Sequence, residues 1–194
     1  MRRVPLQTEK TLSALYLAAR PAPVDAALQS ALAHDLVDVL LAAAGRRGAA
    51  WHKDENGRPV VAATGLAVSI THTTGWVFCA LLATDDTAPR LGIDAEILRP
   101  HPRASKLAAR YFGPFEKEKV TADPAPRAFF DCFTKKEAYA KYCGDGLSRH
   151  LKGDDTAAPD FEATRGVRFL SVEREGVLLT LCLPAGCEPD ICEV

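Results

Sequence analysis

LGIDAEIL, at positions 91–98, decides the fold that we expect for this chain, because its residues alternate in character. Alternation with a period of two is typical of a β-strand that has one buried face. The residues on the apolar face are Leu91, Ile93, Ala95 and Ile97. Asp94 and Glu96 fall on the opposite face, so the segment predicts a strand that presents two carboxylates in the same direction.

The carboxylate pair of Asp94 and Glu96 needs a compensating charge if water does not solvate it. Two anions on one face of a strand repel each other, and this raises a pKa unless a cation lies between them. Mg²⁺ is bound by oxygen ligands of this kind and usually keeps water and substrate phosphate as its other ligands. The pair therefore indicates either a magnesium site or the solvated polar face of an edge strand, and the segment alone favours neither.

A second stretch, FTKKEAYAK at 133–141, belongs to a helix that we expect over 126–143. At about 100° per residue, Lys136, Glu137 and Lys141 lie on one side of this helix. Glu137 is then a candidate third metal ligand, and the two lysines are candidate phosphate contacts. The alternative is an exposed Glu137–Lys141 pair that stabilises the helix by about 0.2–0.5 kcal/mol.

Two more polar residues stand at predicted turns. VSITHTTGW at 68–76 predicts a short strand that ends near His72, where an imidazole can donate to a phosphate oxygen. Arg58 follows the Asn-Gly turn in DENGRP at 54–59, and a guanidinium can bind phosphate with two donors. A single histidine or turn arginine is more often structural or solvated, so each signal is weak by itself.

The loop DDTAPR at 85–90 is the best candidate boundary between two halves of the chain. Each half is predicted to contain strands around one prominent helix. The expected elements are strands at 11–19, 49–53 and 76–83, helices at 25–44, 103–112 and 116–121, a loop at 148–160 and a hairpin at 167–184. We therefore expect an N-terminal half over 1–88, which carries His72, and a C-terminal half over 89–194, which carries the carboxylates and the Lys-Glu helix.

The composition limits the classes of function. Lys and Arg number 24 against 25 Asp and Glu, so no global positive field favours nucleic-acid binding. No apolar run approaches the roughly 20 residues of a membrane-spanning helix. The chain has 6 cysteines, some of them in apolar or helical stretches, and we expect free thiols in a reducing, cytoplasmic compartment. CLPAGCEPDIC at 182–192 has wider spacing than most zinc-binding pairs, so we interpret its cysteines as plain thiols.

The stretch from 56 to 147 contains short motifs of one enzyme family, in that family's order. They are Gly57-Arg58-Pro59, Ser69-Ile70-Thr71-His72-Thr73, Gly92-Ile93-Asp94-Ala95-Glu96, Arg110-Tyr111-Phe112 with Glu116, Phe133-Thr134-Lys135-Lys136-Glu137-Ala138-Tyr139-Ala140-Lys141, and Gly144-Asp145-Gly146-Leu147. On these motifs the chain resembles the 4′-phosphopantetheinyl transferases of the Sfp type. Threonines flank His72 where the family has serine, and Phe133 replaces the family's tryptophan.

The resemblance implies an α+β fold of two similar halves, each a small, mainly antiparallel sheet packed against a long helix, with the active site between the halves. It implies Mg²⁺-dependent transfer of the 4′-phosphopantetheine group from coenzyme A to a serine of an apo acyl or peptidyl carrier protein, with release of 3′,5′-ADP. The metal ligands would be Asp94, Glu96 and Glu137. The coenzyme contacts would be Arg58, Thr71, His72, Lys136 and Lys141. The catalytic residues would be Glu137, Lys141 and Glu116, with Glu116 or Glu137 helping to remove the serine proton.

Two other interpretations stay open. Basic residues that typical family members carry near the N-terminus, to hold the 3′-phosphate of the coenzyme, have no clear counterpart, which supports a non-catalytic module that binds coenzyme A or a carrier protein. Another metal-dependent phosphoryl-transfer enzyme would use similar carboxylates, although the near-neutral charge disfavours a nuclease. In the main interpretation we expect a monomer in the cytoplasm, with no nucleic-acid or membrane partner.

Overall fold

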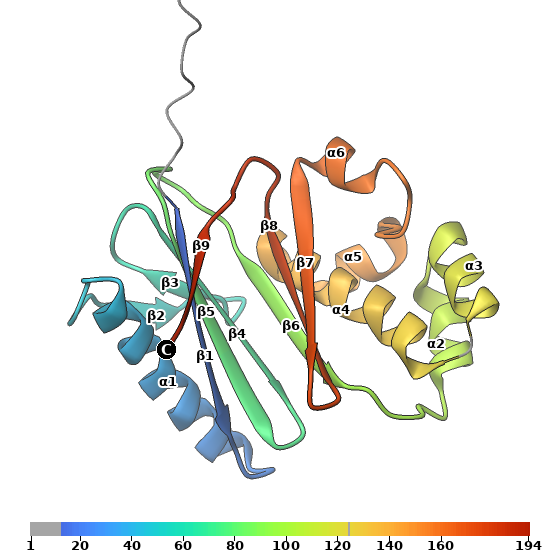
Figure 1. Cartoon of the computed structure of the whole chain (residues 1–194), viewed down its shortest axis with the longest axis horizontal. Helices are drawn as coiled ribbons and strands as arrows, with labels where there is room; N and C mark the ends of the chain where they lie inside the picture. The colour runs from blue at the N-terminus through green and yellow to red at the C-terminus, as the bar shows by residue number, and fades with distance from the viewer. Residues whose placement is uncertain (1–12, 124) are drawn as a thin grey trace, which may run out of the picture.

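The computed structural model describes residues 13–123 and 125–194, and it has an α+β fold (Figure 1). Its first sheet has the strand order β4-β5-β1-β9. These strands are β1 (Ala14–Pro21), β4 (Leu66–Thr73), β5 (Trp76–Ala83) and β9 (Asp190–Glu193). β5 pairs antiparallel with both neighbours, whereas β9 pairs parallel with β1. The first and last strands of the described chain therefore lie side by side.

Helix α1 (Ala26–Ala43) packs on this sheet. Asp25 caps the helix, because its Oδ1 accepts a hydrogen bond of 2.9 Å from the backbone N–H of Leu28. The buried residues of α1 join a core with residues of β1, β4 and β5, and they are Ala33, Leu36, Val37, Leu40 and Leu41. By length and composition alone α1 is apolar enough to cross a membrane, but its packed face is also that of a core helix.

A short hairpin of β2 (Trp51–Lys53) and β3 (Pro59–Val61) follows α1. The Asp54 carboxylate organises its turn by accepting from the backbone N–H groups of Asn56 and Arg58, each at 2.9 Å. Gly57 has a φ of 77°, a left-handed conformation that favours glycine. The predicted Asn-Gly turn is confirmed, and it places Arg58 at the start of β3.

The second sheet has the order β6-β8-β7, formed by β6 (Gly92–Ile97), β8 (Val177–Pro184) and β7 (Val167–Arg174). The long helix α4 (Pro126–Cys143) packs across β6 and β8. At Gly92 the helix and strand approach so closely that a Cβ would lie 1.9 Å from the backbone oxygen of Ala138. A side chain at position 92 would therefore push α4 away from the carboxylates of β6.

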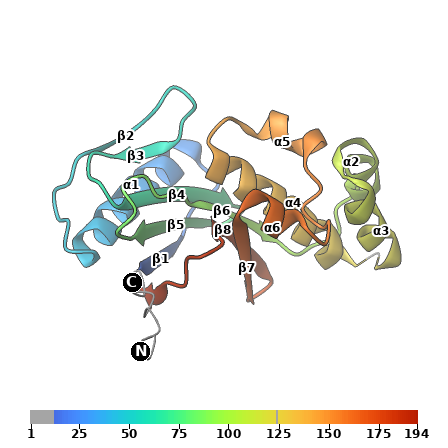
Figure 2. The same cartoon turned by 90° about the horizontal axis from the view of Figure 1, so that it is seen from above.

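Shorter helices border this second sheet: α2 (Ala104–Tyr111), α3 (Pro114–Ala122), α5 (Leu147–Gly153) and α6 (Phe161–Arg165). Figure 2 shows α2 and α3 together at one end of the molecule and α1 near the other. The expected loop over 148–160 is wrong in its first part, because α5 occupies Leu147–Gly153. His150, whose two ring nitrogens both contact aspartates, lies on this helix.

The two sheets meet where β4 lies beside β6 (Figure 1). The hydroxyl of Ser69 accepts a hydrogen bond of 3.1 Å from the backbone N–H of Ile93. Residues of both sheets form one hydrophobic core. It includes Leu15 and Leu82 of the first sheet and Ile93 and Leu181 of the second. Because β4 carries His72 and β6 carries the carboxylates, this junction brings the predicted site residues of the two parts together.

Most of the predicted elements are confirmed, including α1, β5, α4 and the hairpin of β7 and β8. The predicted first strand over 11–19 corresponds to β1, although its residues 11 and 12 lie outside the described residues. β9 was not predicted, and it joins the first sheet even though the sequence assigns its residues to the second half. A tail strand of four residues has too little pattern to be recognised before its partner β1 is known.

Candidate active site

Asp94 is the centre of the candidate site. Its side chain is buried on β6, and its Oδ1 accepts hydrogen bonds of 2.9 Å from the Thr71 hydroxyl and from the Lys141 ammonium. Its second oxygen, Oδ2, is buried without a hydrogen-bond partner among the described residues. A buried carboxylate oxygen that lacks a donor is unfavourable unless a cation binds it or a protonated neighbour, here Glu137, donates to Asp94.

Glu96 lies two residues further along the same face of β6. Thr73 of β4 donates to its Oε2 at 3.3 Å. Burial raises the pKa of Glu96, and the neighbouring Asp94 raises it further. The two threonines around His72 therefore hold the two carboxylates of β6, an arrangement that the alternation of β4 and β6 produces when the strands lie side by side.

Glu137 reaches the same place from α4. Burial raises its pKa to about 8, with further contributions from Asp94 and Glu96, whereas Lys141 lowers it. Three carboxylates thus share one ammonium group, and their mutual repulsion raises the pKa values of two of them. Oxygen-only ligands, an unpaired Asp94 oxygen and excess negative charge are the features that a hard divalent cation needs.

A cavity of about 330 Å³ borders this group through Glu137, whereas Asp94 and Glu96 are not among its lining residues. Its lining includes Glu137 and Lys141 of α4, His72 of β4 and the turn residues Gly57, Arg58 and Pro59, together with Lys53, Asn56, Gly144 and Gly146. Acidic and basic side chains therefore face the same space. Lys53 was missed in the sequence because an exposed lysine beside a turn carries no specific signal.

Arg58 is held against the end of α4. A Cβ at Gly144, the left-handed residue that ends this helix, would lie 2.6 Å from Nη1 of Arg58. The guanidinium therefore lies near the negative end of the helix dipole, where a cation is stabilised. Gly144 makes this approach possible, so the motif glycine of the second part and the motif arginine of the first part meet at the cavity.

Glu116 and Lys136 lie elsewhere. They form an ion pair of 2.9 Å in which both side chains are 0% exposed. Glu116 also accepts hydrogen bonds from the backbone N–H of Gly113 and from the backbone and hydroxyl of Thr156, at 2.7–2.8 Å. Neither residue lines the cavity. Glu116 stays a predicted catalytic residue and Lys136 a predicted coenzyme contact. In this structure neither side chain lies with the other candidate site residues.

Comparison with known proteins finds relatives over the same part of the chain. Residues 90–177 match the family model described as ACPS, 4′-phosphopantetheinyl transferase superfamily. The 4′-phosphopantetheinyl transferase HetI of a Nostoc species is 34% identical over 103 residues, which are 50% of this chain and 42% of that protein. The 4′-phosphopantetheinyl transferase psf-1 of Bacillus pumilus is 31% identical over 137 residues, which are 63% of this chain and 56% of that protein.

The matched part of the sequence contains the structural core of the site. The chain spans about half the length of these curated relatives. The family match over 90–177 nevertheless includes β6, with its two carboxylates, and all of α4, with Glu137 and Lys141. Over residues 90–177 the chain is therefore similar to the 4′-phosphopantetheinyl transferase superfamily.

Proposed function

We propose that this protein transfers the 4′-phosphopantetheine group of coenzyme A to a serine of an apo acyl or peptidyl carrier protein. The observation that carries the proposal is the buried, unpaired oxygen of Asp94 within a three-carboxylate group beside a cavity. Asp94, Glu96 and Glu137 would hold a divalent ion, which we propose to be Mg²⁺. When bound, the ion would neutralise negative charge on the diphosphate of the coenzyme.

The reaction needs positioning and charge stabilisation more than covalent chemistry from the protein. The serine oxygen forms a bond to the β-phosphorus of the coenzyme, and the bond from that phosphorus to the bridging oxygen breaks. The departing 3′,5′-ADP keeps that electron pair. Lys141, which lines the cavity and is already held by Asp94, would donate to the oxygens of the leaving phosphate.

The serine must also lose its proton during the transfer. Of the two carboxylates expected for this step, Glu137 lines the cavity and Glu116 is fully buried. We therefore assign the proton acceptor to Glu137, directly or through water. Glu116 would act through its ion pair with Lys136. This ion pair joins the start of α3 to the middle of α4, and it would thereby position Glu137, the next residue after Lys136.

The opposite side of the cavity would receive the rest of the coenzyme. Arg58 and His72 are the residues proposed to contact its phosphates, and Lys53 adds a third basic group from the same hairpin as Arg58. Thr71 would act on the coenzyme indirectly, because its hydroxyl already donates to Asp94. These basic side chains would replace the N-terminal basic residues with which typical family members hold the 3′-phosphate of the coenzyme.

The carrier protein would dock beside α2. Arg103 at its N-cap and Lys106 and Arg110 within it are exposed and spaced to share one face of the helix. Carrier proteins are acidic, so opposite charges would speed their encounter with this face. We propose that the protein acts as a monomer in the cytoplasm.

The proposal is tested by the intact mass of apo carrier proteins incubated with this protein, coenzyme A and Mg²⁺. We expect the mass gain of one phosphopantetheine group, which is lost in Glu137→Gln and after chelation of metal. Glu188→Gln, an exposed change in the loop before β9, is the matched control and should retain the gain. Binding of coenzyme A without any gain would instead show a non-catalytic module.

A further inference from the structure

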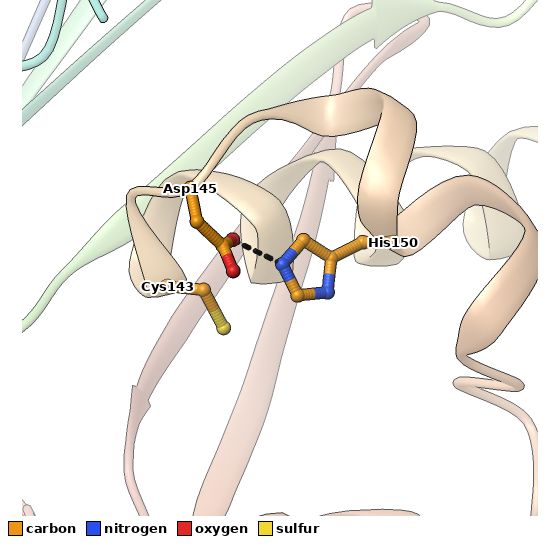
Figure 3. A group of neighbouring side chains, drawn as sticks. All are labelled: Cys143, Asp145 and His150. Atoms are coloured by element: carbon orange, nitrogen blue, oxygen red, sulfur yellow. Dashed lines mark hydrogen bonds and ion pairs between the residues drawn. The ribbon is translucent and has the colours of Figure 1, made fainter.

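The end of α4 carries a second group of potential metal ligands, made of residues other than the three site carboxylates. Cys143 is the last residue of the helix, and Gly144 ends it with a φ of 80°. Gly146 follows with a φ of 91°, so the chain turns back into α5. The turn brings ligand atoms of Cys143, Asp145 and His150 within 4.8 Å of one another. Figure 3 shows the three side chains gathered at this turn, with His150 pointing toward Asp145.

His150 lies between two carboxylates. Its Nδ1 is 2.6 Å from Oδ2 of Asp154, and its Nε2 is within hydrogen-bond distance of Oδ1 of Asp145. A neutral imidazole has a single N–H donor and can satisfy only one of these oxygens. The second contact therefore needs either another proton, as in imidazolium, or a cation that binds both groups.

Each of the two aspartates also pairs with an arginine. Arg165 donates to Oδ1 of the buried Asp154 at 2.7 Å, and Nη1 of Arg149 lies 3.0 Å from Oδ2 of the exposed Asp145. When Nδ1 of His150 donates to Oδ2 of Asp154, the lone pair of Nε2 faces Asp145 and can bind a cation. An aspartate that fixes a histidine in this tautomer is the usual support of a metal-bound imidazole.

We propose that Cys143, Asp145 and His150 bind a zinc-class transition-metal ion at the turn between α4 and α5. Thiolate, imidazole and carboxylate together are typical ligands of zinc, whereas magnesium avoids sulfur. A tetrahedral site needs ligand atoms at separations of roughly 3.3–3.8 Å, and these three atoms already lie within 4.8 Å of one another. This site is independent of the magnesium site proposed at Asp94.

The environment suits three protein ligands and one open position. His150 is buried, and its ring meets the Tyr139 ring edge-on at 5.1 Å between centroids, which restricts its rotation. Asp145 is exposed, so a fourth ligand can enter from solvent. Gly144 and Gly146 of the same turn line the active-site cavity. A bound ion would therefore fix the shape of one cavity wall.

The test uses the whole chain after chelation, titrated with Co²⁺ as a probe of the zinc-class site. Cobalt bound to thiolate gives a charge-transfer absorption that carboxylate-only sites lack. We expect one equivalent of Co²⁺ to produce this absorption and Zn²⁺ to displace it. Cys143→Ser should abolish the absorption, and Asp145→Asn should weaken Co²⁺ binding at least tenfold. Asp154→Asn should weaken it by about 10–100-fold by releasing the imidazole.

Two matched variants distinguish this site from the remaining thiols and from the carboxylate group at Asp94. Cys187→Ser changes another half-buried thiol and should leave the absorption intact. Glu137→Gln removes a ligand of the proposed magnesium site and should also leave it intact, so this inference can fail while the transferase proposal stands. The inference is overturned if no absorption develops, if it survives Cys143→Ser, or if nitrogen NMR shows both His150 ring nitrogens protonated with excess Zn²⁺.

Discussion

Replacing Glu137 with glutamine should stabilise the metal-free protein at neutral pH and flatten its dependence on pH. The folded-state pKa of Glu137 is about 8, against an ordinary value of 4.5, because burial and two neighbouring carboxylates disfavour its charge. Between these values the folded state keeps a proton that the unfolded state has lost. The free energy of unfolding must therefore fall as the pH rises from about 4.5 to about 8.

The size of the effect follows from the same two pKa values. Each pH unit inside the window costs about 1.4 kcal/mol, so the carboxyl of Glu137 destabilises the protein by about 3 kcal/mol between pH 5 and pH 7.5. For a chain of this length that corresponds to a fall of about 6–12 °C in melting temperature. The variant with glutamine should not show this part of the fall.

The assay is urea or thermal unfolding with a chelator present, for the wild type, Glu137→Gln and the exposed control Glu188→Gln. Glu188→Gln controls for the loss of an exposed carboxylate, so the difference between the Glu137→Gln curve and the other two reports on Glu137 together with the neighbouring carboxylates that it repels. Addition of Mg²⁺ at pH 7.5 should restore the stability of the wild type and the control much more than that of Glu137→Gln. Parallel curves for the wild type and Glu137→Gln across pH 5–7.5 would refute the reasoning about the carboxylate group.

Three further changes test other contacts of the site. Thr71→Val removes a donor from a buried carboxylate, so it should lower the free energy of unfolding by about 1–3 kcal/mol and weaken Mg²⁺ binding measured by calorimetry; unchanged stability and affinity would contradict the role of this hydroxyl. Lys136→Met leaves the buried charge of Glu116 without its cation and should cost about 3–5 kcal/mol in denaturant unfolding, and a loss below about 1 kcal/mol would show that water reaches the pair; adding Glu116→Gln should recover only part of the loss, because the donors of Gly113 and Thr156 still need an acceptor. Reversing charge at Arg103 and Lys106 should raise KM for the carrier protein but not for coenzyme A, with a smaller effect at high salt; equal kinetics would exclude this docking surface.

The sequence alone was sufficient where a pattern is local and repeated. The alternation in 91–98 predicts β6 and the shared face of Asp94 and Glu96, and the structure confirms that strand. The helical stretch ending at Cys143 was predicted with the bounds that α4 has. Period and capping act within one element, so they can be recognised without knowing what the element packs against.

The sequence was less informative about the direction of single side chains on that helix. Lys136 and Glu137 are neighbours in the chain and were both expected to face the site. In the structure Glu137 lines the cavity, whereas Lys136 points toward α3 and pairs with Glu116. One side of a helix can contact several neighbouring elements. On α4, the packing of α3 buries Lys136 in an ion pair, whereas the next residue, Glu137, faces the cavity.

What the sequence by itself determined is the inventory of the site: three carboxylates, a lysine, a histidine and a turn arginine in the order of one family. Tertiary structure alone decided that Thr71 donates to Asp94 and that Arg58 lies against Gly144. These contacts join residues of different elements. Their geometry depends on how the sheets and helices pack, which no short stretch of sequence encodes.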